Sequence, residues 1–213
     1  AYNRVLDNEP RDIMVLERKK DALRIKGDHQ GVIEVCNILL QIEPRSKTAH
    51  ADRGDALVAL GRTEDALVEY DYASKLDPGD KVMLNKKGLV LMDLGNFNAA
   101  AEAFDQGWRL DPGDSIMLDN KGRALLAGQD ATGALEAFNE AATLNPSNHT
   151  FRMDQGRALA ALGHYDEALD RLDEGLALNG QDHQIWRYKG NVLFKMGNKE
   201  QAVQSYERSI ELG

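Results

Sequence analysis

Proline recurs in this chain at a fixed interval of 34 residues. The prolines are Pro10, Pro44, Pro78, Pro112 and Pro146. Glycine keeps the same interval ten residues further on, at Gly54, Gly88, Gly122, Gly156 and Gly190. A fixed period of this size predicts short helical units stacked in a row, each resting on its neighbours, rather than one globular core.

The chain divides into six repeats without a single insertion. Their ranges are 13–46, 47–80, 81–114, 115–148, 149–182 and 183–213. Residues 1–12 align with the end of a preceding repeat and predict a remnant of its helix. Repeat position 11 is leucine throughout, at Leu23, Leu57, Leu91, Leu125, Leu159 and Leu193. Position 15 is glycine in every repeat except the fourth, where Gly128 comes one place early.

Each repeat is predicted to hold two helices. Aspartate or asparagine before the first helix accepts its free N–H groups, and the glycine at position 15 ends it. The expected caps of first helices are Asp80, Asp114, Asn148 and Asp182, and those of second helices are Asp28, Asn96, Asp130 and Asn198. Glycine at position 8 lies inside a helix at a cost of about 1 kcal/mol relative to alanine. We therefore expect this glycine to admit the alanine at position 20 and the small residue near position 27, while the bulky residue at position 24 faces the next repeat.

The pattern resembles the tetratricopeptide repeat family over residues 13–213. The resemblance implies an all-α fold, in which antiparallel helix pairs form a right-handed α-solenoid, here as one domain. The first repeat matches least well, since Lys20, Val32 and Cys36 occupy positions that are usually small or aromatic.

The composition of the chain argues against nucleic-acid binding, an internal disulfide and a membrane span. The formal net charge of −9 argues against a nucleic-acid binder, which needs a basic face. The single cysteine excludes an internal disulfide. No apolar run approaches the length of a membrane span, and no signal-peptide pattern opens the chain, so the expectation is a cytoplasmic protein without direct membrane insertion.

No catalytic, metal or cofactor site is predicted. Cys36 occupies a core position of its repeat, where packing is the expected role. The five histidines lack ligand spacing, and the repeat accounts for the glycines that could otherwise indicate a phosphate loop. We therefore expect a protein that is not an enzyme and that uses no cofactor.

The resemblance implies that the first helices line a concave groove, here called the inner face, through repeat positions 2, 5, 6, 9, 12 and 13. The candidate peptide-binding residues at these positions are Asn85, Lys86, Leu89, Met92, Asp119, Asn120, Arg123, Met153, Arg157, Arg187, Tyr188 and Asn191. The inner face is acidic at Asp52 and Asp55 and more basic from the fourth repeat onward. Of the clamp with which some family members bind acidic chaperone tails, only Asn120 is present.

The favoured function is a non-enzymatic module or scaffold that binds a peptide or helix of a partner protein in this groove. Two alternatives remain. One is a structural unit that self-associates through uncapped ends of the array, and the other is the substrate-recruiting arm of a larger enzyme. For any single groove residue, contact with a neighbouring first helix remains the alternative to contact with a ligand.

Overall fold

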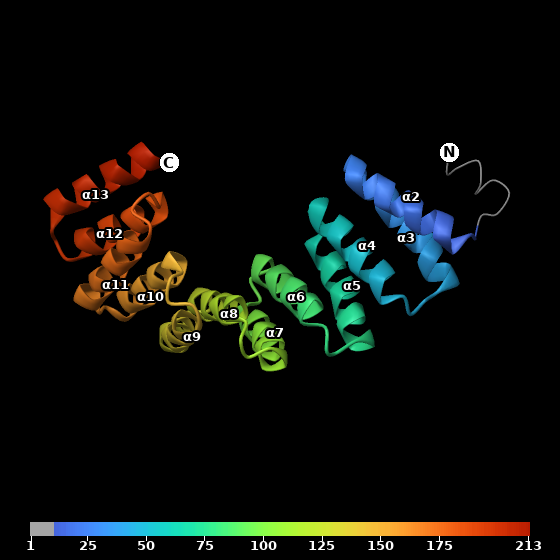
Figure 1. Cartoon of the computed structure of the whole chain (residues 1–213), viewed down its shortest axis with the longest axis horizontal. Helices are drawn as coiled ribbons and strands as arrows, with labels where there is room; N and C mark the ends of the chain where they lie inside the picture. The colour runs from blue at the N-terminus through green and yellow to red at the C-terminus, as the bar shows by residue number, and fades with distance from the viewer. Residues whose placement is uncertain (1–10) are drawn as a thin grey trace. The chain divides into compact units, whose positions relative to one another are not determined.

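The computed structural model describes residues 11–213, and this part of the chain is helical throughout, with no strand. Figure 1 shows the helices following one another as antiparallel pairs. The helices are α2 (Ile13–Lys26), α3 (His29–Ile42), α4 (Lys47–Ala59), α5 (Thr63–Leu76), α6 (Lys81–Asp93), α7 (Phe97–Leu110), α8 (Ser115–Ala127), α9 (Ala131–Leu144), α10 (His149–Leu162), α11 (Tyr165–Leu178), α12 (His183–Lys195) and α13 (Lys199–Leu212). Most of the expected remnant over 1–12 lies outside the described residues.

The chain forms two compact units, of which the first ends at Leu110 and the second begins at Asp111. Within each unit every helix packs against the next one in the sequence, and the fold is an all-α solenoid. In the second unit, α8 also contacts α10, and α10 contacts α12, more extensively than the second helices contact one another. The first helices therefore line the inside of this unit's curve. None of the described helices is long and apolar enough to cross a membrane.

The predicted caps of the first helices are all present. The side chains of Asp80, Asp114 and Asp182 each accept hydrogen bonds from two backbone N–H groups at the start of α6, α8 and α12, and Asn148 accepts one from Thr150. The second helices follow the prediction less closely. Asp28 and Asp130 cap α3 and α9, whereas the side chain of Asn198 makes no capping bond to α13.

Repeat position 15 takes the left-handed backbone conformation that ends each first helix. The five glycines at this position have φ between 72° and 85°. In the fourth repeat the left-handed residue is Gln129, with φ 69°, and Gly128 keeps an ordinary φ of −77°. Gln129 donates its backbone N–H to Leu126, and Asp130 donates to Leu125, as the glycines and their followers do elsewhere. The early glycine is therefore not the residue that turns the chain.

The glycine at position 8 packs under the bulky side chain at position 24 of its own repeat. A Cβ added at Gly88 would lie 2.5 Å from Cε1 of Phe104, and one at Gly122 would lie 2.5 Å from Cε1 of Phe138. Gly54, Gly156 and Gly190 have the same relation to Tyr70, Leu172 and Tyr206. The nearest atoms to each of these glycines thus belong to the side chain at position 24 rather than to the alanine at position 20, and at Gly156 the backbone oxygen of Ala168 is also among them.

Polar pairs join neighbouring repeats inside each unit. At each such junction the residue at position 25 of one repeat hydrogen-bonds to the residue at position 7 of the next. The pairs are Asn37 with Arg53, Asp71 with Lys87, Asn139 with Gln155, and Asp173 with Lys189. Each of these junctions thus has one such pair beside its apolar contacts.

Replacing Gln129 with glycine is expected to stabilise the second unit by about 1 kcal/mol, because a side chain in the left-handed region crowds its own backbone. Chemical denaturation followed by circular dichroism measures the change. The matched variant Gly163→Gln introduces the same strain one repeat later and is expected to destabilise by a similar amount. Equal stability of Gln129→Gly and the parent would contradict the assignment.

Replacing Gly122 with alanine is expected to destabilise the protein by about 1–3 kcal/mol, although alanine is the better helix former. The added methyl group would overlap the ring of Phe138, which is fully buried. In a double-mutant cycle with Phe138→Ala, the cost of Gly122→Ala should fall toward zero. A cost that stays the same would show that the ring is not the obstacle.

Candidate functional site

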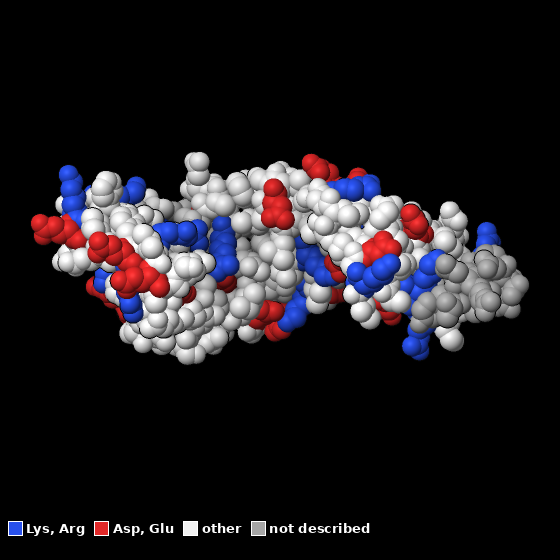
Figure 2. All heavy atoms as spheres, turned by 90° about the horizontal axis from the view of Figure 1, so that it is seen from above, with Lys and Arg blue, Asp and Glu red and all other residues white. Residues whose placement is uncertain are grey.

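The inner face of the second unit gathers positive charge. Of the side chains at inner-face positions on α8, α10 and α12, four are cationic, namely Arg123, Arg157, Arg187 and Lys195. Only two carboxylates share these positions, Asp119 and Asp154, and both are buried. Figure 2 shows Lys and Arg side chains over this unit, interspersed with Asp and Glu side chains.

Asp154 lies at the centre of an ion-pair network. Its side chain is fully buried and accepts from Nε of Arg123 at 2.9 Å and from NH1 of Arg157 at 2.6 Å. Arg123 belongs to α8 and Asp154 to α10, so this pair joins two repeats. The buried charge is thereby compensated, as burial of a carboxylate requires.

Asp119 is a less well compensated carboxyl group. Its Oδ2 lies 3.1 Å from Arg123, while its Oδ1 is buried without a hydrogen-bond partner among the described residues. Burial, together with the neighbouring carboxylate of Asp154, raises the pKa of Asp119 to about 7. Arg123 and Arg157 oppose the shift but do not cancel it. Asp119 therefore holds its proton far more tightly than an exposed aspartate does.

Tyr188 on α12 holds two guanidinium groups. That of Arg157 lies 4.9 Å from the ring centroid, and that of Arg187 lies 5.2 Å from it. Beside the ring a pocket of about 380 Å³ opens between α10 and α12. Its lining combines small and apolar side chains such as Ala160, Ala161 and Val192 with the polar groups of Arg157, Tyr188, Asn191 and Lys195.

Three other predicted residues of the second unit take no part in the ion-pair network around Asp154. Met153 is buried and packs in an apolar cluster of the core, so it offers little surface to a ligand. Asn120 is half-buried on α8. Asn191 is exposed and accepts a hydrogen bond of 2.9 Å from the hydroxyl of Tyr206.

The predicted residues of the first unit lie on α6. Lys86 donates to both carboxylate oxygens of Asp55 at 2.6 Å and lies over the ring of Tyr70. Leu89 is exposed, whereas Asn85 and Met92 are half-buried. Lys86, Arg123 and Arg157 therefore all make lateral contacts between neighbouring first helices, the alternative that the sequence left open.

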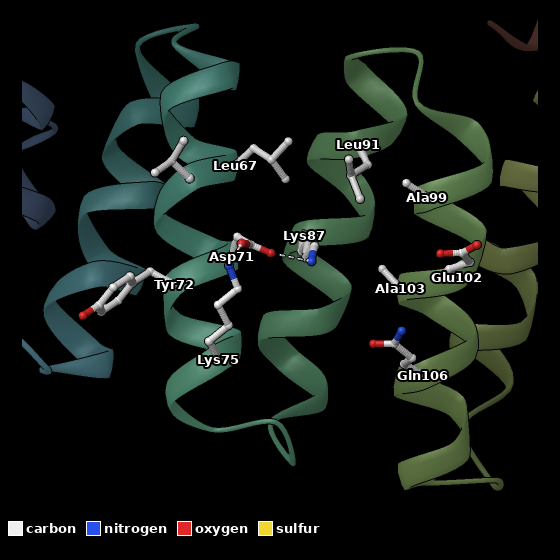
Figure 3. A pocket seen from close by; sticks show the side chains of 11 residues that line it. Leu67, Asp71, Tyr72, Lys75, Lys87, Leu91, Ala99, Glu102, Ala103 and Gln106 are labelled. Atoms are coloured by element: carbon white, nitrogen blue, oxygen red, sulfur yellow. Dashed lines mark hydrogen bonds and ion pairs between the residues drawn. The ribbon is translucent and has the colours of Figure 1, made fainter.

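A second pocket, which the sequence analysis missed, lies between α5, α6 and α7 and has a volume of about 450 Å³. Figure 3 shows Asp71 pointing at Lys87, with Ala103 and Gln106 of α7 facing them. Repeat position 23, which lines the pocket, is the small Ala103. Ser205 leaves a similar pocket at the same place between the fifth and sixth repeats. A small residue at position 23 is the sequence signal that could have found both.

The remaining reactive groups have structural roles. Burial raises the pKa of the Cys36 thiol to about 12, so it stays protonated in the core. His50 bonds to Glu69 at 2.7 Å and packs against the ring of Tyr72. No group of His, Cys, Asp and Glu within residues 11–213 could hold a metal ion.

The raised pKa of Asp119 predicts a pH-dependent stability. An aspartate of the unfolded chain titrates near pH 4, so the folded state binds the proton more tightly. The contribution of this proton to the free energy of unfolding is at most about 4 kcal/mol. It is fully present below about pH 4 and falls to zero as the pH rises through about 7. The side-chain amide of an Asp119→Asn variant cannot ionise, so relative to the parent the variant should gain stability over this range.

Urea unfolding of both proteins at several pH values measures the difference. Asp170→Asn removes an exposed carboxylate of the same unit and serves as the control, for which a flat difference is expected. A stability difference between Asp119→Asn and the parent that does not change with pH would contradict the shift.

Comparison with known proteins places this geometry in a family. A search of curated proteins gave no match. Among solved structures, a tetratricopeptide repeat protein from Parabacteroides merdae ATCC 43184 superposes with a TM-score of 0.85 at 18% identity, covering 93% of this chain and 78% of that one. MamA from Desulfovibrio magneticus RS-1 gives 0.69 at 17% identity, covering 78% and 94%. YrrB, described as a TPR protein with an unusual peptide-binding site, gives 0.63 at 20% identity, covering 84% and 93%.

At these low identities the superpositions establish a shared fold and nothing more. The sequence carries the family assignment. A tetratricopeptide repeat profile matches residues 85–149 and 153–213, and a second one matches residues 48–71. The first profile alone accounts for more than half of the chain, which therefore belongs to the tetratricopeptide repeat family.

Proposed function

We propose that the chain is a non-enzymatic interaction module whose second unit binds a segment of a partner protein on its inner face. The observation that carries this proposal is the pocket of about 380 Å³ between α10 and α12, which places an apolar floor beside Arg157 and Lys195. A cavity of this size accepts one large side chain, and the surrounding polar groups can fix the chain that bears it.

Exposed apolar side chains elsewhere on the inner face support the proposal. Phe194 on α12 is 59% exposed and Ile116 on α8 is 52% exposed, at inner-face positions 12 and 2. Within the first unit, taken by itself, Leu89 and Val82 on α6 have similar exposure. Apolar side chains repeated along one face indicate an interaction surface better than isolated ones do. The structure of YrrB, with its unusual peptide-binding site, is consistent with the use of this fold for binding peptides.

Contacts between neighbouring first helices determine which cations can be replaced in a binding test without disturbing the fold. Arg123 and Arg157 neutralise the buried Asp154, so their replacement by glutamate would leave a buried charge unpaired and would destabilise the fold. Arg187 and Lys195 are exposed and make no ion pair within the described part of the chain. They are therefore the better probes of binding.

A photo-crosslinking residue in place of Ala161, which is exposed at the pocket, is expected to capture a protein partner in cell extract. The yield should fall at least about tenfold when Arg187→Glu and Lys195→Glu are combined, since two favourable charges become repulsive. The matched variant Lys199→Glu, exposed on α13, should leave the yield unchanged. Equal yields from all three proteins, or stronger capture from a crosslinker at Gln201 in the pocket near α13, would contradict binding at the inner face.

A further inference from the structure

The two units differ in the balance of charge at their inner-face positions. In the first unit five carboxylates and three cations occupy these positions, and two of the cations are paired, Arg24 with Asp21 and Asp52, and Lys86 with Asp55. In the second unit, two of the four cations, Arg187 and Lys195, have no carboxylate within ion-pair distance in residues 11–213. Positive charge is thus left over in a chain whose formal net charge is −9.

Tyr188 concentrates this charge. Its ring holds the guanidinium groups of both Arg157 and Arg187 at about 5 Å from its centroid. Only Arg157 of the two has a carboxylate partner, the fully buried Asp154, and it uses one of its five N–H donors there. Two like charges held close together repel each other unless an anion is added. The arrangement therefore lacks a negative group on its solvent side.

The buried carboxyl groups do not fill that place. Asp154 is fully covered and its two oxygens are bound to Arg123 and Arg157. Asp119 lies on α8, is also buried, and faces Arg123 and Asp154. Neither side chain reaches the exposed ends of Arg187 and Lys195, so an approaching carboxylate would meet cations first.

The spacing along α12 indicates how an acidic ligand would lie. Arg187 and Lys195 are eight residues apart on this helix, a rise of about 12 Å, and Asn191 and Val192 of the pocket lie between them. An extended chain advances about 3.3 Å per residue, so side chains four residues apart are separated by about 13 Å. An apolar residue with a carboxylate two residues to either side therefore matches the pocket and both cations.

We propose that the inner face of the second unit binds an extended acidic segment in which Asp or Glu stands two residues before and two residues after an apolar side chain. The apolar side chain enters the pocket between α10 and α12, and the carboxylates meet Arg187 and Lys195. This inference rests on the proposed function. Because the cations are spread along the helix, internal acidic residues fit better than a single C-terminal carboxylate.

Fluorescent peptides test the inference directly. The probe carries a central leucine and two glutamates at the stated spacing in a glycine–serine background, and its binding is measured by anisotropy. The affinity should fall at least about tenfold when both glutamates become glutamine, when the leucine becomes serine, or when the protein carries Arg187→Glu with Lys195→Glu. Lys199→Glu should bind as the parent does. Raising the salt from about 50 mM to about 500 mM should weaken binding severalfold, because exposed charges are screened.

The result that would overturn the inference is different from the one that would overturn the proposed function. Equal or tighter binding of the glutamine or lysine version, with amide chemical shifts still changing on α10 and α12, would refute an acidic ligand and leave peptide binding intact. Tighter binding of a peptide that ends in a leucine carboxylate would refute the internal spacing. Absence of binding by every peptide would refute the inference, whereas the crosslink at Ala161 tests the proposed function independently.

Discussion

The contact between a glycine on the first helix and a bulky side chain on the second is the constraint on which five of the six repeats depend. At Gly88 and Gly122 the two helices approach so closely that the rings of Phe104 and Phe138 occupy the space of a missing side chain. This close approach fixes the rotation of both helices about their axes. It therefore also fixes which side chains of the first helix are left for the neighbouring repeats and for solvent.

Helix rotation explains the arrangement of charge on the inner face. Once the glycine at position 8 faces its own repeat, position 9 of one repeat comes to lie beside position 6 of the next. Asp55 meets Lys86, Arg123 meets Asp154, and Arg157 meets Tyr188 in this way. The same register leaves Arg187 and Lys195 of the last repeat exposed. Packing inside each repeat thus determines which charges are neutralised and which remain available.

Much of the fold could be predicted because the period repeats one local signal many times. Helix caps and left-handed glycines depend on neighbouring residues only, and the prediction for position 15 held wherever glycine stood there. The exception was Gln129, because a glycine one place earlier gave the stronger signal although the backbone there did not need it. The partner of the position 8 glycine was missed because it depends on helix rotation, which spacing alone does not give. Likewise, the pairing of Arg123 with Asp154 joins residues 31 apart and becomes visible only when position 9 is compared with position 6 of the next repeat.

The polar pairs between positions 25 and 7 affect how local unfolding passes from one repeat to the next within each unit. Every such pair belongs to a single junction, and the next junction shares none of its atoms. A solenoid held together in this way behaves as a chain of separate couplings. A partner seated across α10 and α12 would brace the junction of Asp173 with Lys189 directly. It would act on the junction of Asn139 with Gln155 only through Arg157 and Asp154, which also binds Arg123 of α8. Opening can therefore begin locally at one junction, and the buried Asp154 is the link through which it would reach the next.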